Sequence, residues 1–141
     1  MRFVNTITID RAPGDVFAYL AQFENLPRWN YAIAETRKVT DGPVGVGARY
    51  VQLRTIPSRS EETFEVVDFE PDRRLAIRGG FGPFSGDAAY ELDGATVLTN
   101  TFDLHASGPL NLVTPLLGRQ VKSAVAANLD VLKQILERDH A

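Results

Sequence analysis

The chain has 141 residues, 44% of them hydrophobic, which is enough to bury a substantial core, and we expect a single domain over residues 1–141. A formal charge of −3 argues against a nucleic-acid partner, and the absence of cysteine excludes disulfides and thiolate metal sites. The two histidines, His105 and His140, lie far apart in the sequence, so we expect no metal ion and no cofactor.

The first ten residues, MRFVNTITID, alternate in the manner of a strand and lack the apolar run and cleavage site of a signal peptide. No apolar run approaches the roughly 18 to 20 residues that cross a bilayer. We therefore expect a cytoplasmic protein without an integral membrane segment, either a monomer or a homodimer.

Period-2 alternation predicts the first strand over residues 2–10. A short helix then begins at Pro13, because proline suits a first helical turn and Asp15 lies near the positive end of the helix dipole. After it, Phe23 and the only tryptophan, Trp29, fall on a connecting segment. So much aromatic surface on a connection indicates that this segment covers part of the core.

Six further strand-like runs follow, separated by turn residues at short intervals, which is typical of an antiparallel sheet. The pair Asp93–Gly94 predicts a tight hairpin in which Gly94 takes a positive φ. The sequence GGFGP is also interpreted as a hairpin loop. The six runs lie near residues 31–40, 47–56, 60–69, 73–79, 84–92 and 95–106.

Apolar residues at helical spacing predict one long helix over residues 107–138. Pro115 removes a backbone donor, so we expect a kink or a fresh start there, with Thr114 as the cap. The order is strand, short helices, six strands and long helix. Helices segregated in this way indicate an α+β fold, with a curved antiparallel sheet gripping the C-terminal helix.

Four stretches carry a resemblance to a known family: ITIDRAPGDVFAYLAQFENLPRWN, DGPVGVGARY, FEVVDFEPDRRLAIRG and the terminal LDVLKQILE. Together they resemble the START-like (SRPBCC) superfamily, and within it the polyketide cyclase/dehydrase-like group, over nearly the entire chain. The resemblance implies the helix-grip fold: seven antiparallel strands curve around a long C-terminal helix, with two short helices after strand 1. It also implies an elongated apolar cavity between sheet and helix.

Members of that superfamily carry lipids, sterols, polyketides or plant hormones, some cyclise or dehydrate polyketides, and others bind proteins with little cavity. No residue set is common to these activities, so the resemblance transfers no catalytic residue. Here a dry void of about 300 Å³ would cost about 7 kcal/mol at roughly 24 cal/mol per Å³. A retained cavity should therefore hold ligand or water, since a domain is stable by only about 5 to 15 kcal/mol.

The short helices after the first strand would form a lid whose inner surface is Phe17, Phe23, Leu26 and Trp29. Trp29 is either a structural wedge or a ligand contact. Asn100 shares strand parity with Phe102, so it either bonds a neighbour such as Tyr90 or awaits a ligand carbonyl or hydroxyl. The expected ligand-binding residues are Trp29, Tyr50, Gln52, Phe64, Phe81, Tyr90, Asn100, Phe102, Leu117, Val121 and Asn128.

Catalytic candidates are few. His105 has the opposite parity to Phe102 and should point to solvent, but an enzyme would most naturally recruit it or a buried carboxylate such as Glu62 or Asp103. The pair Glu61–Glu62 is otherwise interpreted as solvated charge at a strand end.

Three functions follow from these observations. The first is binding of a hydrophobic small molecule, lipid-like or polyketide-like, between sheet and helix. The second is a cofactor-free enzyme of the polyketide cyclase, aromatase or dehydratase type that uses the same cavity. The third is a protein-interaction module with a filled core, which would expose a contiguous apolar patch.

Overall fold

The structure is a computed structural model that describes the backbone of residues 1–106 and 114–139 and the side chains of residues 1–105 and 118–138. Seven strands form one antiparallel sheet in the order β1-β7-β6-β5-β4-β3-β2. The elements are β1 (Arg2–Thr8), α1 (Pro13–Ala21), the 3-10 helix η1 (Phe23–Asn25), α2 (Leu26–Trp29), β2 (Ile33–Lys38), β3 (Arg49–Arg54), β4 (Ser60–Glu70), β5 (Arg74–Phe81), β6 (Phe84–Leu92), β7 (Val97–Ala106) and α3 (Thr114–Asp139).

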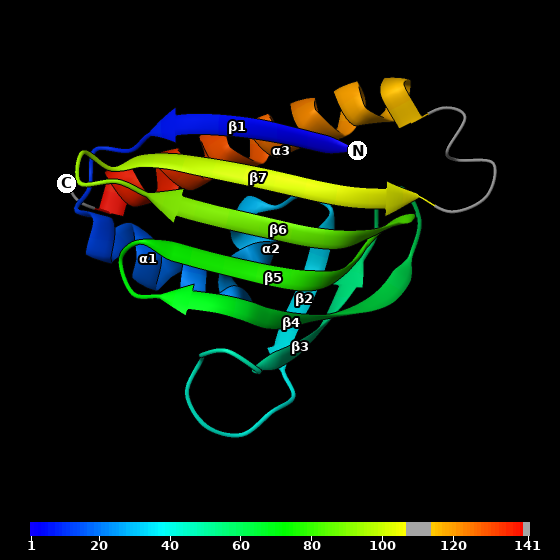
Figure 1. The fold of residues 1–141 in the computed structure, drawn as a ribbon, viewed down its shortest axis with the longest axis horizontal. Coiled ribbons are helices and arrows are strands. Elements are labelled where there is room, and N and C mark those ends of the chain that lie inside the picture. The colour runs from blue at the N-terminus through cyan, green and yellow to red at the C-terminus, as the bar shows by residue number, and fades with distance from the viewer. Residues whose placement is uncertain (107–113, 140–141) are drawn as a thin grey trace.

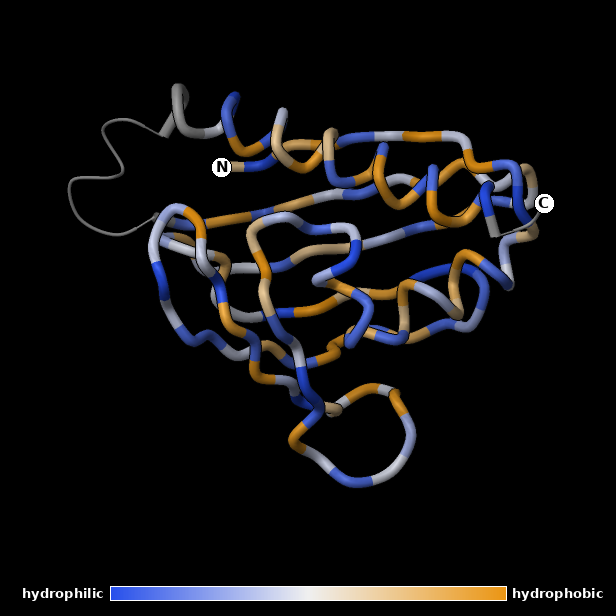
Figure 2. The backbone as a smooth tube through the Cα atoms, turned by 180° about the vertical axis from the view of Figure 1, so that it is seen from behind, coloured by the Kyte–Doolittle hydropathy of each residue, from blue (hydrophilic) through white to orange (hydrophobic). Residues whose placement is uncertain are grey.

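All the helices lie on one side of the curved sheet, which we call the concave face; the other side is the convex face. Figure 1 shows α3 running behind β1 and β7, with α1 and α2 behind the remaining strands. Figure 2 looks onto the helices themselves. This arrangement is the expected α+β helix-grip fold. In the described part of the chain, no helix is both long and apolar enough to span a membrane.

Two glycines allow the sheet to bend. Gly79 on β5 is the register partner of Gly86 on β6 and of Phe64 on β4. A Cβ at Gly79 would lie 2.1 Å from the carbonyl oxygen of Thr63, and one at Gly86 would lie 2.1 Å from that of Asp103. Such close backbone approach is possible only for glycine.

The expected loop at GGFGP is therefore wrong in its extent. Gly79 and Gly80 belong to β5, which continues to Phe81, and the turn consists of Gly82 and Pro83. Gly82 has a φ of 68°, the left-handed conformation that glycine adopts without strain.

The predicted positive φ at Gly94 is also wrong, because the left-handed residue of that hairpin is Thr96, with a φ of 56°. The Asp93 carboxylate accepts hydrogen bonds from the backbone N–H groups of Ala95 and Val97, both at 3.0 Å. Thr96 Oγ1 donates to the carbonyl of Arg11 at 2.6 Å. These bonds build a longer turn than a two-residue Asp-Gly hairpin.

The C-terminal half of α3 packs solidly against the sheet and the short helices. Leu129, Leu132 and Leu136 are fully buried in one cluster with α1, α2 and the central strands. Burial of each such side chain contributes about 1.5–3 kcal/mol. The guanidinium of Arg11 donates to the carbonyl of Leu136 at 2.6 Å and so ties this end of α3 to the start of α1.

α3 begins at Thr114, one position before Pro115. A proline in the first turn of a helix sacrifices no helical hydrogen bond. The predicted kink or fresh start at Pro115 and the predicted cap at Thr114 depend on the residues before α3, which lie outside the described part of the chain. The expected beginning of the helix over residues 107–113 lies outside the described residues.

The short helices cover the concave face with aromatic side chains, as the lid prediction requires. Phe17, Phe23, Leu26 and Trp29 are all buried. The ring of Phe23 lies edge-on to those of Tyr50 and Phe64, with centroids 4.8 and 5.2 Å apart. Such pairs contribute about 0.5–1.5 kcal/mol beyond area burial.

Candidate functional site

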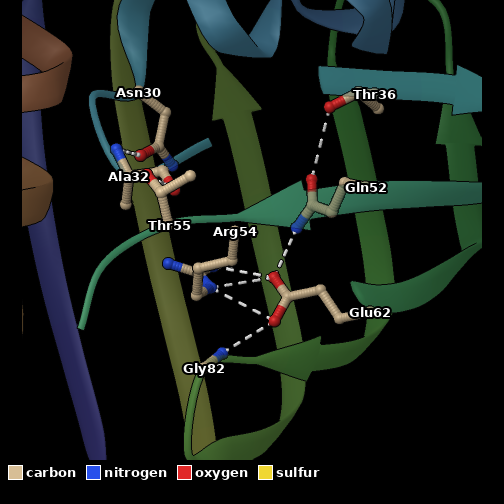
Figure 3. Close-up of polar contacts among 8 residues, drawn as sticks. All are labelled: Asn30, Ala32, Thr36, Gln52, Arg54, Thr55, Glu62 and Gly82. Atoms are coloured by element: carbon tan, nitrogen blue, oxygen red, sulfur yellow. Dashed lines mark hydrogen bonds and ion pairs between the residues drawn. The ribbon is translucent and has the colours of Figure 1, made fainter. Parts of the chain in front are cut away.

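A row of polar side chains crosses the concave face from β2 to β4, among otherwise apolar neighbours (Figure 3). On β3, Gln52 and Arg54 share the parity of the buried Tyr50. On β4, Glu62 shares the parity of the buried Phe64. We call the four residues Thr36, Gln52, Arg54 and Glu62 the polar row.

Glu62 is the centre of the polar row. Its carboxylate accepts hydrogen bonds from Gln52 Nε2 at 2.6 Å and from the backbone N–H of Gly82 at 2.9 Å. Arg54 donates to it through Nε at 3.0 and 3.1 Å, and Arg54 Nη2 lies 2.9 Å from Oε1. Thr36 Oγ1 donates to Gln52 Oε1 at 3.5 Å. A carboxylate engaged by this many donors is a structural anchor and is poorly suited to act as a base toward a ligand.

Arg54 is only half used by this anchor. Its side chain is 13% exposed, and Glu62 occupies the edge of the guanidinium formed by Nε and Nη2. Among the described residues none accepts a hydrogen bond from its other N–H groups, and Figure 3 shows one terminal nitrogen directed away from Glu62. A guanidinium held in this way presents free donors to an oxygen atom on the concave face.

The interpretation of Glu62 as a solvated charge is wrong. The carboxyl-bearing side chain is 8% exposed and faces inward, whereas its neighbour Glu61 is exposed. The turn of β5 and β6 explains the difference, since Gly82 covers the Glu62 carboxylate and donates to it. The position of Glu62 near the end of a strand gives no indication in the sequence that Gly82 covers its carboxylate.

Asn100 lies on β7 and is 0% exposed. Its Nδ2 donates to the carbonyl of Ala89 at 3.0 Å, so the expected bond to a neighbour is made to Ala89 and not to Tyr90. Its Oδ1 is buried and, within the described part of the chain, has no hydrogen-bond partner. A buried acceptor in that state costs about 1–3 kcal/mol.

Aromatic side chains flank these polar groups. The rings of Tyr50 and Phe64 stack with centroids 5.1 Å apart. At the end of the sheet near the start of α3, Phe102 stacks on Phe3 at 5.2 Å and meets Phe81 edge-on at 5.7 Å. Phe81 and Phe102 are only half-buried, so they leave apolar surface uncovered.

The two inward tyrosines are held in their protonated form. Burial, with a smaller contribution from the charge of Glu24, raises the pKa of Tyr50 to about 12. Burial also raises the pKa of Tyr90 above its usual range. At neutral pH both phenols are therefore hydrogen-bond donors and not bases.

These tyrosines predict alkaline instability. Because each folded-state pKa is raised above the unfolded value of 10.0, their contribution to stability is complete below pH 10 and is lost as pH rises toward 12. We expect the variant Tyr50→Phe/Tyr90→Phe to lose less stability than the parent over this interval, as measured by urea unfolding. The exposed Tyr31 provides the control Tyr31→Phe, which should follow the parent. Identical pH profiles for all three proteins would contradict the assignment.

The other expected ligand-binding residues differ in their burial and in the contacts that they make. Trp29 is buried with its ring 6.3 Å from that of Tyr90, centroid to centroid. Asn128 Oδ1 accepts from the backbone N–H of Tyr31 at 3.4 Å, so it joins α3 to the end of the lid. Val121 is half-buried and, like Phe81 and Phe102, packs against the buried cluster of Phe3, Phe84 and Leu104. The side chain of Leu117 lies outside the described residues.

His105 and Asp103 both lie on the convex face. Register pairs His105 with Ser85 and Asp103 with Asp87, on the side of the sheet away from the helices. His105 is exposed, as its parity predicted, and Asp103 is exposed too, so the idea of Asp103 as a buried carboxylate is wrong. Neither side chain can reach a ligand on the concave face.

The hollows formed by described residues include the following three. The largest of these three, about 800 Å³, is a groove between the start of β1 and the first turns of α3, lined by Met1, Phe3, Gly118 and their neighbours. The others, about 460 and 390 Å³, lie on the convex face around Gly79. None of these three is an elongated space between sheet and helix, so that cavity stays a prediction.

Arg54 is absent from the expected ligand-binding residues, although period-2 alternation in the sequence indicates that it faces inward. Alternation from Tyr50 through Gln52 reaches Arg54 in the inward position, and alternation from Phe64 reaches Glu62. Opposite charges with inward parity on adjacent strands indicate a buried pair. The rule that charges at strand ends are solvated concealed it.

Comparison with known proteins gives a match over residues 1–137 to the family described as polyketide cyclase/dehydrase and lipid transport. No curated protein matches the sequence. Among solved structures, the protein TTHA0849 from Thermus thermophilus is similar with a TM-score of 0.81, at 14% identity and with 100% of both chains covered.

Two further solved structures are similar to this chain, one of an aromatase/cyclase and one of a plant protein. The Zhui aromatase/cyclase from Streptomyces sp. R1128 has a TM-score of 0.73 at 18% identity, covering 100% of this chain and 96% of that one. The major latex-like protein 151 of Panax ginseng has a TM-score of 0.68 at 15% identity, covering 100% and 97%. At such identities these likenesses concern the fold. Since the family match spans nearly the whole length, the chain belongs to the polyketide cyclase/dehydrase and lipid transport family of START-like proteins.

Proposed function

We propose that the protein binds a largely apolar small molecule, lipid-like or polyketide-like, between the concave face and α3, and that Arg54 holds an oxygen atom of this ligand. The observation that carries the proposal is the guanidinium of Arg54, which is half-buried, is anchored by Glu62 and keeps N–H groups that no described residue accepts. Placing a charged pair on an otherwise apolar surface is costly in desolvation. A ligand oxygen that accepts hydrogen bonds from the remaining N–H groups of Arg54 would offset part of this desolvation cost.

The surroundings of Arg54 suit an apolar ligand. The turn residue Gly82 packs next to Arg54, since a Cβ there would lie 3.5 Å from Arg54 Cδ. Gly82 follows Phe81, which with Phe102 and Val121 presents half-buried apolar surface. Burying about 200 Å² of ligand surface there would yield roughly 5 kcal/mol before association costs.

The filled half of the interior limits where the ligand can lie. Leu129, Leu132 and Leu136 pack in one buried cluster with α1, α2 and the central strands along the C-terminal half of α3, so we place the ligand near the N-terminal half. The groove between β1 and α3 reaches that end, because its Phe3 stacks on Phe102. This groove is a suitable entrance.

A cofactor-free cyclisation is the second candidate. In this case the free N–H groups of Arg54 would stabilise negative charge developing on a substrate oxygen, as preorganised donors do in oxyanion holes. The family description and the aromatase/cyclase neighbour support it. Protonated Tyr90 could deliver a proton, but His105 and Asp103 could not act as the base from the convex face.

The role of Arg54 is tested with the variant Arg54→Met/Glu62→Gln, which removes both charges together and keeps an acceptor for the Gly82 N–H. The matched control is Arg78→Met/Asp87→Asn, which neutralises an ion pair on the convex face. We expect the first variant to bind 1-anilinonaphthalene-8-sulfonate at least about tenfold more weakly, equivalent to about 1.4 kcal/mol, and the control to match the parent.

Fluorescence titration of the probe measures these affinities, and circular dichroism confirms that each variant is folded. Equal affinities for the parent and Arg54→Met/Glu62→Gln would remove Arg54 from the binding site. Equal weakening by both variants would point to general electrostatics.

A further inference from the structure

We propose that Asn100 makes the concave face selective for ligands that carry a hydroxyl donor, such as an alcohol, a phenol or an enol, over ligands that offer only acceptors. This inference rests on the proposed function and names the class of ligand within it. It concerns a position separate from Arg54, on β7 and not on β3.

The orientation of the Asn100 amide is fixed by its backbone partner. The carbonyl of Ala89 can only accept a hydrogen bond, and the Asn100 side chain meets it at 3.0 Å. The amide nitrogen must therefore be the atom next to Ala89, because the flipped amide would set two oxygens against each other. Consequently the group left without a partner is the oxygen, which is an acceptor.

Neither cross-strand neighbour on the same face satisfies this oxygen. Register places Asn5 of β1 and Tyr90 of β6 directly opposite Asn100. The Asn5 amide nitrogen donates instead to the carbonyl of Lys122 at 3.3 Å. Tyr90 lies beside Asn100, yet Oδ1 remains without a partner within the described residues. The protein thus leaves a buried acceptor without a partner on the concave side of β7, the second strand from one edge of the sheet.

An open buried acceptor discriminates between ligands by chemistry. A hydroxyl donates to it and recovers the cost of burial, whereas a ketone, ether or ester oxygen at the same place meets another acceptor and is repelled. Sites built to hydrogen-bond a hydroxyl reject analogues that lack it strongly. Arg54 supplies donors and Asn100 supplies an acceptor, so the preferred ligand carries both an acceptor oxygen and a hydroxyl.

The test compares 2-naphthol with 2-methoxynaphthalene, which share a ring system but differ in the donor. The methyl ether is the more hydrophobic of the two, so burial alone would favour it. Trp29 is the only tryptophan and lies next to Tyr90, the direct neighbour of Asn100, so its fluorescence reports binding. We expect the naphthol to bind at least about fivefold more tightly to the parent protein.

The preference should depend on Asn100 itself. In Asn100→Leu, which keeps the branched shape of the side chain, enlarges it and removes the acceptor, we expect the ether to bind as tightly as the naphthol or more so. Asn100→Asp keeps an oxygen acceptor, so it should retain a preference for the naphthol and serves if the leucine variant does not fold. The control Thr101→Val changes the next residue of β7 and should behave like the parent.

The outcomes separate this inference from the proposed function. A naphthol preference that survives in Asn100→Leu, or equal binding of both probes by the parent, overturns the selectivity while leaving the binding function in place. The absence of a saturable Trp29 response to both probes overturns the proposed function, and the inference with it.

Discussion

Replacing Gly79 with alanine is expected to prevent stable folding. The added Cβ would lie 2.1 Å from the carbonyl oxygen of Thr63 and 2.7 Å from the Cα of Phe64. Both atoms belong to backbone, so no side chain can move aside to relieve the clash. We expect a loss of more than about 4 kcal/mol in the free energy of unfolding, at the extreme of single substitutions.

Urea unfolding followed by circular dichroism measures this loss. Gly94→Ala is the matched control, because no atom lies within 4 Å of the Cβ position there and its φ is not in the left-handed region. It should change stability by no more than about 1 kcal/mol. A Gly79→Ala protein as stable as this control would show that the sheet does not bend at the Gly79–Gly86 pair.

Breaking the Arg54–Glu62 pair from one side is expected to be the second large effect. In Glu62→Leu the half-buried guanidinium of Arg54 loses its anion, and in Arg54→Met the buried carboxylate of Glu62 loses its cation. Each single variant should lose about 3–5 kcal/mol of stability. The double variant Arg54→Met/Glu62→Leu should lose much less than the sum, because no uncompensated charge remains.

The same double-mutant cycle at Arg78 and Asp87 provides the comparison. That pair lies on the convex face with side chains 65% and 42% exposed, so its coupling should stay within about 1 kcal/mol. Additive losses of stability at Arg54 and Glu62 would mean that the two charges do not stabilise each other. This result would contradict the claim that Glu62 anchors the Arg54 guanidinium.

The fold could be predicted from the sequence because its main signals are local and periodic. Alternation located all seven strands, and the helical spacing after residue 114 located α3. Gly79 shows where this fails. The sequence pattern places Gly79 in a loop, but the residue belongs to β5. Glycine is required there because the backbone of the neighbouring strand β4 approaches too closely for a Cβ.

The site was predictable only in part, for a related reason. Parity correctly turned Asn100 inward, but the choice between Tyr90 and Ala89 as its partner depends on distances between strands. Similarly, the burial of Glu62 depends on Gly82, which is 20 residues away in sequence and reaches it only through the β5–β6 turn. Pattern in one strand cannot supply such contacts.

The packing of α3 also bears on the interaction-module alternative. That alternative requires an interior filled along its whole length, and the described residues fill it around Leu129 and Leu132. Toward the start of α3, however, Phe81 and Phe102 remain half-buried and Arg54 keeps unused donors. The uncovered apolar surface and the unused donors at this end of the interior favour the binding of a small ligand there over the binding of a protein partner.

Native mass spectrometry of freshly purified protein, followed by extraction with organic solvent, tests the binding of an apolar ligand most directly. We expect a population with added mass that disappears on extraction and yields a hydrophobic molecule bearing at least one oxygen. That population should be strongly reduced in Arg54→Met/Glu62→Gln and unchanged in Arg78→Met/Asp87→Asn. A parent protein that carries no added mass and acquires none when offered lipid-like or polyketide-like molecules would contradict the account.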